Sequence, residues 1–357
     1  LSNHPGLTVG AAELSLDYTG TLTPAVATGS YLLGGGNQVY TSSSNRGFSV
    51  SNLTDGAEAT GVVIGRHGIV ELKAGNTYSG GTVVTNGGVL FLREDGLGAV
   101  PVAPDPDNLY VDNGVIRSGN ANFTLAANRG LTVGPGGLEL HPWGTYSMTV
   151  AGNLAGSGKM TVTDTGWVTF AGAGNTYSGL LEVSAGRNIR IGDGDHFSWS
   201  PAGAFTLNGT LALNYNSDWT VSYPFSGTGA LRKEGSGTLT LSGENSYNGV
   251  TYIDAGTLRV TATNVLPGGA GKGVVTIAAG ATLETDGRDM QVGGLNGAGH
   301  VKDSTGTTTV LYVGADHVTA SFAGTTDPQF DIIKIGNGTQ RLTSPDGSFV
   351  NAEIRAG

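Results

Sequence analysis

The 357-residue chain contains no cysteine, so it can hold neither a disulfide nor a thiolate metal site. Charged residues make up 13% of it, about half of the usual share near 25%. No apolar run approaches the roughly 20 residues that a membrane-spanning helix needs. Basic residues are outnumbered 28 to 18, and the net charge of −10 would repel a nucleic-acid backbone. We therefore expect neither membrane insertion nor a nucleic-acid partner.

Glycine is abundant instead, with 62 residues, more than double the usual share of roughly 7%. A helical protein is disfavoured, because each interior glycine costs a helix about 1 kcal/mol. Proline occurs only 12 times and the glycines follow no triplet period, which excludes collagen. Short alternations of apolar and polar residues, such as 238–241 and 257–260, are separated by glycine and asparagine. This period of two predicts strands throughout and an all-β protein.

A five-residue motif recurs three times, at 76–80, 175–179 and 245–249, and in each copy asparagine comes first, tyrosine third and glycine fifth. The predicted structural motif residues are therefore Asn76, Tyr78, Gly80, Asn175, Tyr177, Gly179, Asn245, Tyr247 and Gly249. Apolar residues two positions apart flank the motifs, and side chains two apart on a strand share one face. Each copy therefore predicts three short strands that bury the same edge. After the first motif we place Val89 and Phe91 on that edge, matching Leu258 and Val260 after the third.

The motifs are separated by 99 and 70 residues, which is too irregular for the blades of a propeller. A solenoid tolerates unequal coils, because each coil contacts only its neighbours and extra residues leave as loops. We predict a right-handed parallel β-helix (a β-solenoid) that forms a single elongated domain over residues 31–357. Its repeat cores are 62–92, 154–191 and 225–260. Residues 1–30 are predicted to be an N-terminal segment that supplies an edge strand or an inter-subunit contact.

Each motif residue has an expected structural role. The asparagine suits a turn with positive φ, and the glycine lets the chain double back. The tyrosine ring is expected to cover the end of the core with its hydroxyl in solvent. The functional alternative is a ladder of tyrosines that binds a ligand.

Residues 235–249 and 255–258 resemble the autotransporter-associated β-strand repeat of bacterial passenger domains. Residues 31–36, 127–134, 294–299 and 309–314 are similar to connecting segments between such repeats, so the resemblance covers roughly residues 30–343. The resemblance implies a β-helix that is secreted or displayed on a bacterial cell surface, often as one segment of a very large protein.

No constellation of residues predicts a catalytic, cofactor-binding or metal site. The turn at Asp193, Asp195 and His196 has oxygen ligands for calcium, but the further carboxylates of a calcium loop are missing, so a solvated turn fits better. Glu284 and Asp286 could form the carboxylate pair of a polysaccharide hydrolase, against the simpler interpretation of an exposed strand face. The residues suited to stacking on sugars are Trp143, Trp167, Trp199 and Trp219, with core packing as the alternative.

We therefore predict a non-enzymatic extracellular structural protein, a rigid β-helical rod that serves as a surface stalk, adhesive spacer or filament subunit. The alternative is a β-helix that binds carbohydrate or cleaves polysaccharide. The expected partners are further copies of the chain, through end-to-end stacking or strand addition, and surface glycans. No cofactor is expected.

Overall fold

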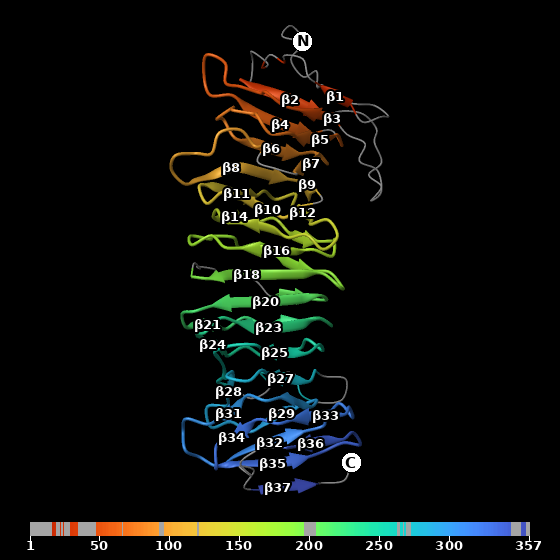
Figure 1. Cartoon of the computed structure of the whole chain (residues 1–357), viewed down its shortest axis with the longest axis vertical. Coiled ribbons are helices and arrows are strands. Elements are labelled where there is room, and N and C mark those ends of the chain that lie inside the picture. The colour runs from red at the N-terminus through yellow and green to blue at the C-terminus, as the bar shows by residue number, and fades with distance from the viewer. Residues whose placement is uncertain are drawn as a thin grey trace. The chain divides into compact units, whose positions relative to one another are not determined.

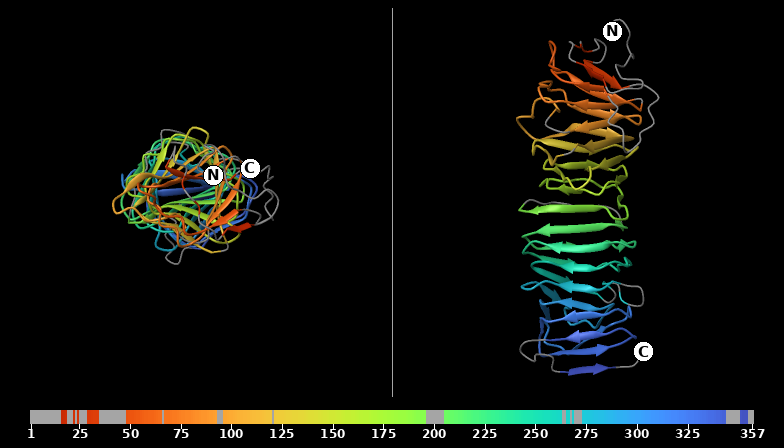
Figure 2. Two further views of the ribbon diagram at one scale, coloured as in Figure 1. Left: turned by 90° about the horizontal axis from the view of Figure 1, so that it is seen from above. Right: turned by 45° about the vertical axis from the view of Figure 1, so that its right-hand side comes forward.

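The computed structural model describes residues 16–18, 22, 24, 29–34, 48–65, 67–92, 96–119, 121–195, 205–262, 265–266, 268, 273–343 and 351–354. These residues form strands and turns, and none of them is in a helix. The chain divides into two compact units, Leu1–Glu182 with Phe197–Gly203 (unit 1) and Val183–His196 with Ala204–Gly357 (unit 2). Every strand pair described within a unit is parallel, so the predicted all-β parallel β-solenoid is confirmed (Figures 1 and 2).

The strands of unit 1 are short, and most have three to five residues. They are β1 (Leu16–Tyr18), β2 (Ser30–Gly34), β3 (Phe48–Val50), β4 (Gly61–Gly65), β5 (Ile69–Leu72), β6 (Thr82–Thr85), β7 (Val89–Leu92), β8 (Asp105–Asp112), β9 (Gly114–Ser118), β10 (Phe123–Leu125), β11 (Arg129–Val133), β12 (Leu138–His141), β13 (Met148–Val150), β14 (Leu154–Gly156), β15 (Met160–Val162) and β16 (Trp167–Phe170). Strand β17 (Leu181–Val183) lies where unit 1 ends and unit 2 begins.

The chain of unit 1 winds from sheet to sheet. One sheet has the order β14-β11-β8-β6-β4-β2, and another contains β1-β3-β5-β7-β9-β12-β15. A third contains β10-β13-β16. Successive strands of the sequence therefore belong to different sheets, and a strand pairs with the strand one coil later. Within residues 1–30, β1 pairs with β3 of the same chain, and residues 1–15 lie outside the described part.

Unit 2 repeats this winding. Its strands are β18 (Asn188–Gly194), β19 (Phe205–Leu207), β20 (Thr210–Tyr215), β21 (Trp219–Val221), β22 (Phe225–Ser226), β23 (Ala230–Glu234), β24 (Thr238–Leu241), β25 (Thr251–Ile253), β26 (Thr257–Val260), β27 (Val275–Ile277), β28 (Thr282–Glu284), β29 (Met290–Val292), β30 (Leu295–Gly297), β31 (His300–Lys302), β32 (Thr309–Val313), β33 (Ala320–Phe322), β34 (Thr325–Thr326), β35 (Phe330–Lys334), β36 (Gln340–Leu342) and β37 (Asn351–Ile354).

Three sheets organise most of unit 2. They follow the orders β18-β20-β23-β25-β27-β30-β33-β36, β21-β24-β26-β28-β31-β34 and β29-β32-β35-β37. Strands β19 and β22 pair with each other. In Figure 1 the strands of this unit run from green to blue as successive layers.

Each unit contains a narrow core of stacked aliphatic side chains. In unit 1 Ile64, Val84, Val111 and Val133 are in register on four consecutive strands of one sheet, and each is at most 1% exposed. Such alternation follows from the period of two, because every second residue of a strand points inward. Each fully buried Val or Ile contributes about 1.5–3 kcal/mol. The stacked column therefore supplies the main stabilisation of the coils.

The predicted register after the first motif is wrong by one residue. Val70 of β5 pairs with Leu90 of β7, so Leu90 and Leu92 face the core. Val89 and Phe91 point to the opposite face, and both are buried there, with the Arg117 guanidinium 5.7 Å from the centre of the Phe91 ring. The first inward residue of the following strand comes twelve residues after the motif tyrosine in the first copy (Leu90) and eleven residues after it in the third (Leu258). A shift of one residue turns every side chain of a strand to the other face.

Candidate functional site

The three motif asparagines make the same hydrogen bond to the preceding coil. Their side-chain oxygens accept the backbone N–H groups of Leu53, Leu154 and Phe225 at 2.7–2.8 Å. The backbone N–H that follows each asparagine donates to the carbonyl of the same three residues. An asparagine therefore continues the hydrogen bonding between coils through a turn that has no regular strand.

The amide nitrogens of these asparagines bind carbonyl oxygens as well. Asn76 donates to Lys73 in its own coil and to Gly96 in the next coil, and Asn245 donates to Val265 of the next coil at 2.6 Å. All three asparagines are buried, and none has positive φ. The expectation of a turn with positive φ was therefore wrong. Burial of the amide is compensated because both its oxygen and its nitrogen find backbone partners.

The three motif tyrosines are at most 1% exposed. The expectation that their hydroxyls lie in solvent was therefore wrong. In the first and third motifs the hydroxyl is 2.6 Å from the hydroxyl of a threonine four residues later, Thr82 or Thr251. The second motif has Leu181 at that position. There the Tyr177 hydroxyl donates to the carbonyl of Gly158 at 2.7 Å or of Leu180 at 3.0 Å. Each tyrosine thus fills the core and satisfies its one polar atom.

The motif glycines are required by the close approach of two coils. Their φ values are not positive, which corrects the expected role in reversing the chain. A Cβ atom on Gly80 would lie 2.6 Å from the carbonyl carbon of Thr60. On Gly179 or Gly249 it would overlap the carbonyl oxygen of the glycine one coil earlier. Any side chain at these positions would separate the coils.

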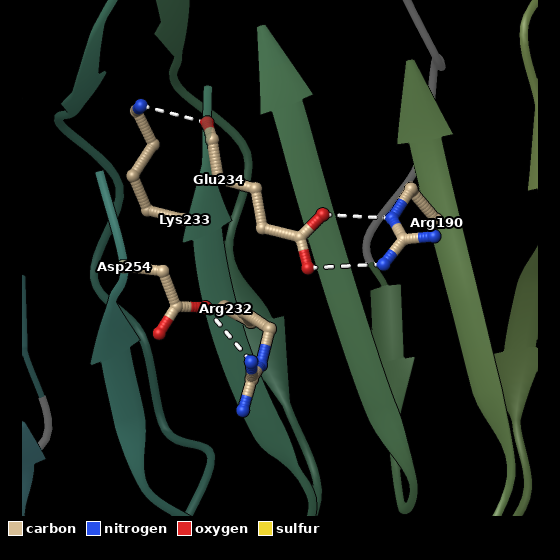
Figure 3. A network of polar contacts seen from close by, with 5 residues as sticks. All are labelled: Arg190, Arg232, Lys233, Glu234 and Asp254. Carbon is tan, nitrogen blue, oxygen red and sulfur yellow. Dashed lines mark hydrogen bonds and ion pairs between the residues drawn. The ribbon is translucent and has the colours of Figure 1, made fainter. Parts of the chain in front are cut away.

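A charged network joins β18, β23 and the residue that follows β25 in unit 2 (Figure 3). Arg190 of β18 and Glu234 of β23 form a two-point ion pair at 2.7 and 3.2 Å. Strand β20 lies between them, and its Ala212 is in register with Arg190 and is fully buried. A small side chain at this position lets the ion pair cross the intervening strand. Arg232 binds Asp254 of the next coil at 2.9 Å.

Lys233 points inward and is only 1% exposed. It is in register with Leu213 and Ile253, which are core residues. Its ammonium donates to the carbonyl oxygens of Glu234, Gly235 and Ala255 at 2.7–3.1 Å. Burial lowers the pKa of Lys233 to about 8. Through the carbonyl of Ala255, the ammonium holds the end of one coil to the next.

Burial raises the pKa of four tyrosines, Tyr177, Tyr215, Tyr223 and Tyr247, above the ordinary value of 10.0. In the unfolded chain tyrosines ionise near pH 10, while in the folded chain these four still hold their protons just above that pH. Stability is complete below pH 10 and is lost above it, by about 1.4 kcal/mol per pH unit for each tyrosine. Urea unfolding between pH 9 and 11.5 measures this loss. The opposite contribution of Lys233 ends near pH 10.5, where the unfolded lysine also loses its proton.

Tyr223→Phe provides the control for this pH dependence. The Tyr223 hydroxyl is buried and has no hydrogen-bond partner among the described residues, so we expect the variant to be at least as stable at pH 8. Above pH 10 the free energy of unfolding of the variant should fall less steeply than that of the wild type, by about 1.4 kcal/mol per pH unit, because one buried tyrosine is missing. Equal slopes in the two proteins would contradict the assignment.

A loop over residues 96–104 precedes β8. Val102 is fully exposed and Val100 is 43% exposed. Beneath the loop, the fully buried Arg129 donates to the carbonyls of Leu97 and Gly98 and to the side-chain oxygen of Asn108. These bonds fix the base of the loop.

Arg129→Met should therefore release the loop while leaving the coils folded. The variant leaves three buried acceptors without a donor, each at a cost of about 1–3 kcal/mol. We expect faster protease cleavage and faster hydrogen exchange in residues 96–104, with little change in unit 2. If cleavage stays as slow as in the wild type, the arginine does not hold the loop.

A groove crosses three coils on the outer face of unit 1, with a volume of about 380 Å³. It is lined by Gly87, Asn113, Gly114, Val115, Gly136, Gly137, Leu138, Glu139, Lys159 and Thr161, and we call it the β9–β15 groove. Val115, Glu139 and Thr161 are in register on β9, β12 and β15 and form one row. Gly87, Gly136 and Gly137 of the lining lie in the adjacent turns and carry no side chain.

The charges of the groove are fixed by neighbouring side chains. His141 lies 2.9 Å from Glu139 and also 2.9 Å from the hydroxyl of Thr163. The hydrogen bond with His141 holds the pKa of the Glu139 carboxyl below its ordinary value, so the carboxyl is ionised at neutral pH. Lys159 pairs with Glu182 at 2.6 Å and is 53% exposed. The groove thus presents one carboxylate and one ammonium to solvent.

The carboxylates considered as a catalytic pair have structural contacts. Glu284 is 2% exposed in its side chain, pairs with Arg259 at 3.0 Å and accepts a hydrogen bond from Ser304 at 2.5 Å. Burial would raise its pKa, but these bonds hold it below the ordinary value. Asp286 occupies a turn with φ 52°. The Glu284 carboxyl is therefore held ionised in an ion pair within the fold.

In the segment weighed as a calcium loop and predicted to be a solvated turn, Asp193 lies near the end of β18, its side chain accepts the backbone N–H of Asp195, and His196 lies outside the described residues. The described residues contain no group of three or more His, Asp or Glu side chains suited to a metal ion. Nor do they include a helix with the length and apolar character to cross a membrane.

The tryptophans of the described part are half-buried rather than exposed. Trp143 is covered by Arg117, whose guanidinium lies 4.3 Å from the ring centre. Trp219 packs edge-on against Tyr215 with ring centres 4.9 Å apart. Trp167 begins β16, and Trp199 lies outside the described residues. The rings of Trp143 and Trp219 are therefore committed to packing.

Sequence reasoning missed Arg129, Lys233 and the β9–β15 groove. Arg129 stands directly before a glycine at the start of an apolar strand, and Lys233 shares the period-two face of Leu231. Those positions were the available signals. The groove had none, because its residues come from positions up to 74 apart in the sequence.

The passenger-associated transport repeat matches residues 68–90, 160–187 and 231–260. Each match contains one of the three motifs. The chain is also similar to the protein named Adhesin BmaC autotransporter from Brucella suis, with 29% identity over 378 aligned positions. That alignment covers 94% of this chain and 10% of the adhesin, so the chain spans about a tenth of that relative's length. No solved structure gives a significant match.

The repeat matches fall on the coils whose asparagine, tyrosine and glycine join one coil to the next. The relative is itself named an autotransporter. Together with the parallel coils, these findings identify the chain as a β-helix protein of the autotransporter passenger-repeat type.

Proposed function

We propose that the chain is a non-enzymatic segment of a surface-displayed adhesin, in which stacked coils form a stiff scaffold that holds binding surfaces away from the cell. The observation that carries the proposal is the commitment of its recurring polar residues to the scaffold. The motif asparagines and tyrosines all bind groups of their own or neighbouring coils.

The similarity to an autotransporter adhesin over 94% of the chain supports both an adhesive role and a location at the bacterial surface. The absence of cysteine is compatible with this location, because the coils are joined by main-chain and side-chain hydrogen bonds and need no disulfide. The excess of acidic residues favours solubility over self-aggregation.

An adhesion assay tests this proposal. Microspheres coated with the whole chain should attach to cultured host cells, and the soluble chain should compete with them. Spheres coated with albumin are the control. Attachment no greater than that of the albumin spheres would contradict an adhesive role.

A second assay tests the non-enzymatic part. The chain should release no sugar from a panel of polysaccharides. Release that disappears in Glu284→Gln or Asp286→Asn, with unchanged stability, would show that the chain is a glycan-cleaving enzyme.

A further inference from the structure

The β9–β15 groove is a concave surface within a flank of the solenoid. Its volume of about 380 Å³ lies within the range of roughly 300–1,000 Å³ that is usual for small-molecule sites. The row of Val115, Glu139 and Thr161 crosses three successive coils at the spacing of about 4.8 Å between neighbouring strands. The row therefore matches an extended ligand with regularly repeated polar groups.

The groove offers hydrogen-bond donors and acceptors of several kinds. Glu139 is an acceptor, Lys159 a donor, and the Thr161 hydroxyl and the exposed Asn113 amide can act as both. Half-buried Val115 supplies an apolar contact beside them. This mixture suits a sugar ring, whose hydroxyls both donate and accept while its C–H face is apolar.

Two other ligand classes fit the groove less well. A strongly anionic polymer needs a cluster of cations, but Lys159 is the one cation of the lining and Glu139 offsets its charge. A peptide that adds as a strand needs a free sheet edge. Strand β12 has no free edge, because it pairs with β9 on one side and with β15 on the other.

We infer that the β9–β15 groove binds a neutral oligosaccharide of two or three sugar units, with Glu139, Lys159 and Thr161 as its hydrogen-bonding residues. This inference rests on the proposed adhesive function and names the chemical class of its partner. The binding is non-covalent and leaves the sugar unchanged.

Two glycines of the lining are tightly enclosed by their neighbours. A Cβ atom on Gly136 would lie 2.8 Å from the Cβ of Asn113 and from a carboxylate oxygen of Asp112. At the end of the lining, the ring of the exposed His67 lies against Gly87. Neither Gly136 nor Gly87 therefore has room for a side chain.

Titration calorimetry on the whole chain tests the inference, with lactose, maltotriose and N,N′-diacetylchitobiose as neutral probes and heparin and a sialylated trisaccharide as anionic ones. We expect saturable binding of at least one neutral probe. Glu139→Gln should weaken it about tenfold or more, and Thr161→Val about threefold to tenfold, as expected for a lost charged or neutral hydrogen bond. Lys159→Gln should weaken it as well.

Thr276→Val is the matched control, because Thr276 is also a half-buried threonine at the centre of a three-residue strand. Its affinity should equal that of the wild type, and all variants should keep the wild-type urea midpoint. No binding of any neutral probe, binding of the anionic probes alone, or equal affinities in Glu139→Gln and wild type would overturn the inference. If the coated spheres still adhere to cells in that case, the adhesive function stands and only the ligand class is wrong.

Discussion

Tyr247→Ala should lower the free energy of unfolding of unit 2 by about 3–5 kcal/mol, as for other large aromatic side chains removed from a core. Tyr247 is fully buried, and its hydroxyl is 2.6 Å from that of Thr251. The substitution leaves a cavity between two coils and also leaves the threonine hydroxyl without its partner. Urea unfolding followed by far-UV circular dichroism measures the loss.

Two further variants separate packing from hydrogen bonding. Tyr247→Phe keeps the ring and should cost about 1–3 kcal/mol, the penalty for an unpaired buried hydroxyl. Tyr312→Ala removes a half-buried tyrosine that alternates with the inward residues of β32, and it should cost clearly less than Tyr247→Ala. If Tyr247→Ala and Tyr312→Ala cost the same, the motif tyrosine is not a core residue.

Asn245→Leu should destabilise unit 2 by about 2–5 kcal/mol. The leucine is similar in size, but it leaves the N–H of Phe225 and the carbonyl of Val265 unpaired in a buried place. Each such group costs about 1–3 kcal/mol. The loss should appear in urea unfolding and as faster hydrogen exchange of the Phe225 amide.

Asn337→Leu is the control for this substitution. Asn337 is exposed, and it is the backbone N–H of this residue that takes part in a hydrogen bond, with His317. We expect a change within about 0.5 kcal/mol, as for most surface substitutions. A cost for Asn245→Leu that is no larger would contradict the bridging role of the motif asparagine.

The sequence predicted the fold class because two periodicities survive in it. The period of two along each strand places residues such as Leu239 and Leu241 inward, and both are buried. The recurring motif identifies equivalent positions in different coils. Backbone hydrogen bonds between coils are then the simplest way to stack equivalent strands.

The register of single strands could not be predicted as well. Turns between strands differ in length by one residue, and one residue exchanges the buried and exposed faces. In the first and second copies the inward residue, Leu90 or Ile189, comes twelve residues after the motif tyrosine. In the third copy Leu258 comes eleven residues after it. Aligning the first motif with the third therefore placed Val89 where Leu90 belongs.

The roles of the motif residues depended on contacts between coils that are about 20 residues apart in sequence. Asparagine and glycine have strong local preferences for turns, and those preferences suggested positive φ. In the structure the asparagine side chain binds backbone of a neighbouring coil, and the glycine allows that coil to approach. Local preference is overridden here by the stacking of the coils.

The most direct test of the stacked coils is disulfide formation between engineered cysteines, because the natural chain has none. Val63 and Val83 are partners on β4 and β6 of unit 1, and Thr276 and Asn296 on β27 and β30 of unit 2. Parallel neighbours lie about 4.8 Å apart, within the Cα separation of roughly 4.4–6.8 Å that a disulfide needs. Each double-cysteine variant should be oxidised to an intramolecular disulfide under mild conditions, as detected by mass spectrometry of the linked peptides. A third variant carries cysteines in place of Tyr252 and Asn296, which lie two coils apart. If this variant becomes linked while the two neighbouring pairs stay reduced in the folded chain, the parallel register on which the whole account depends is contradicted.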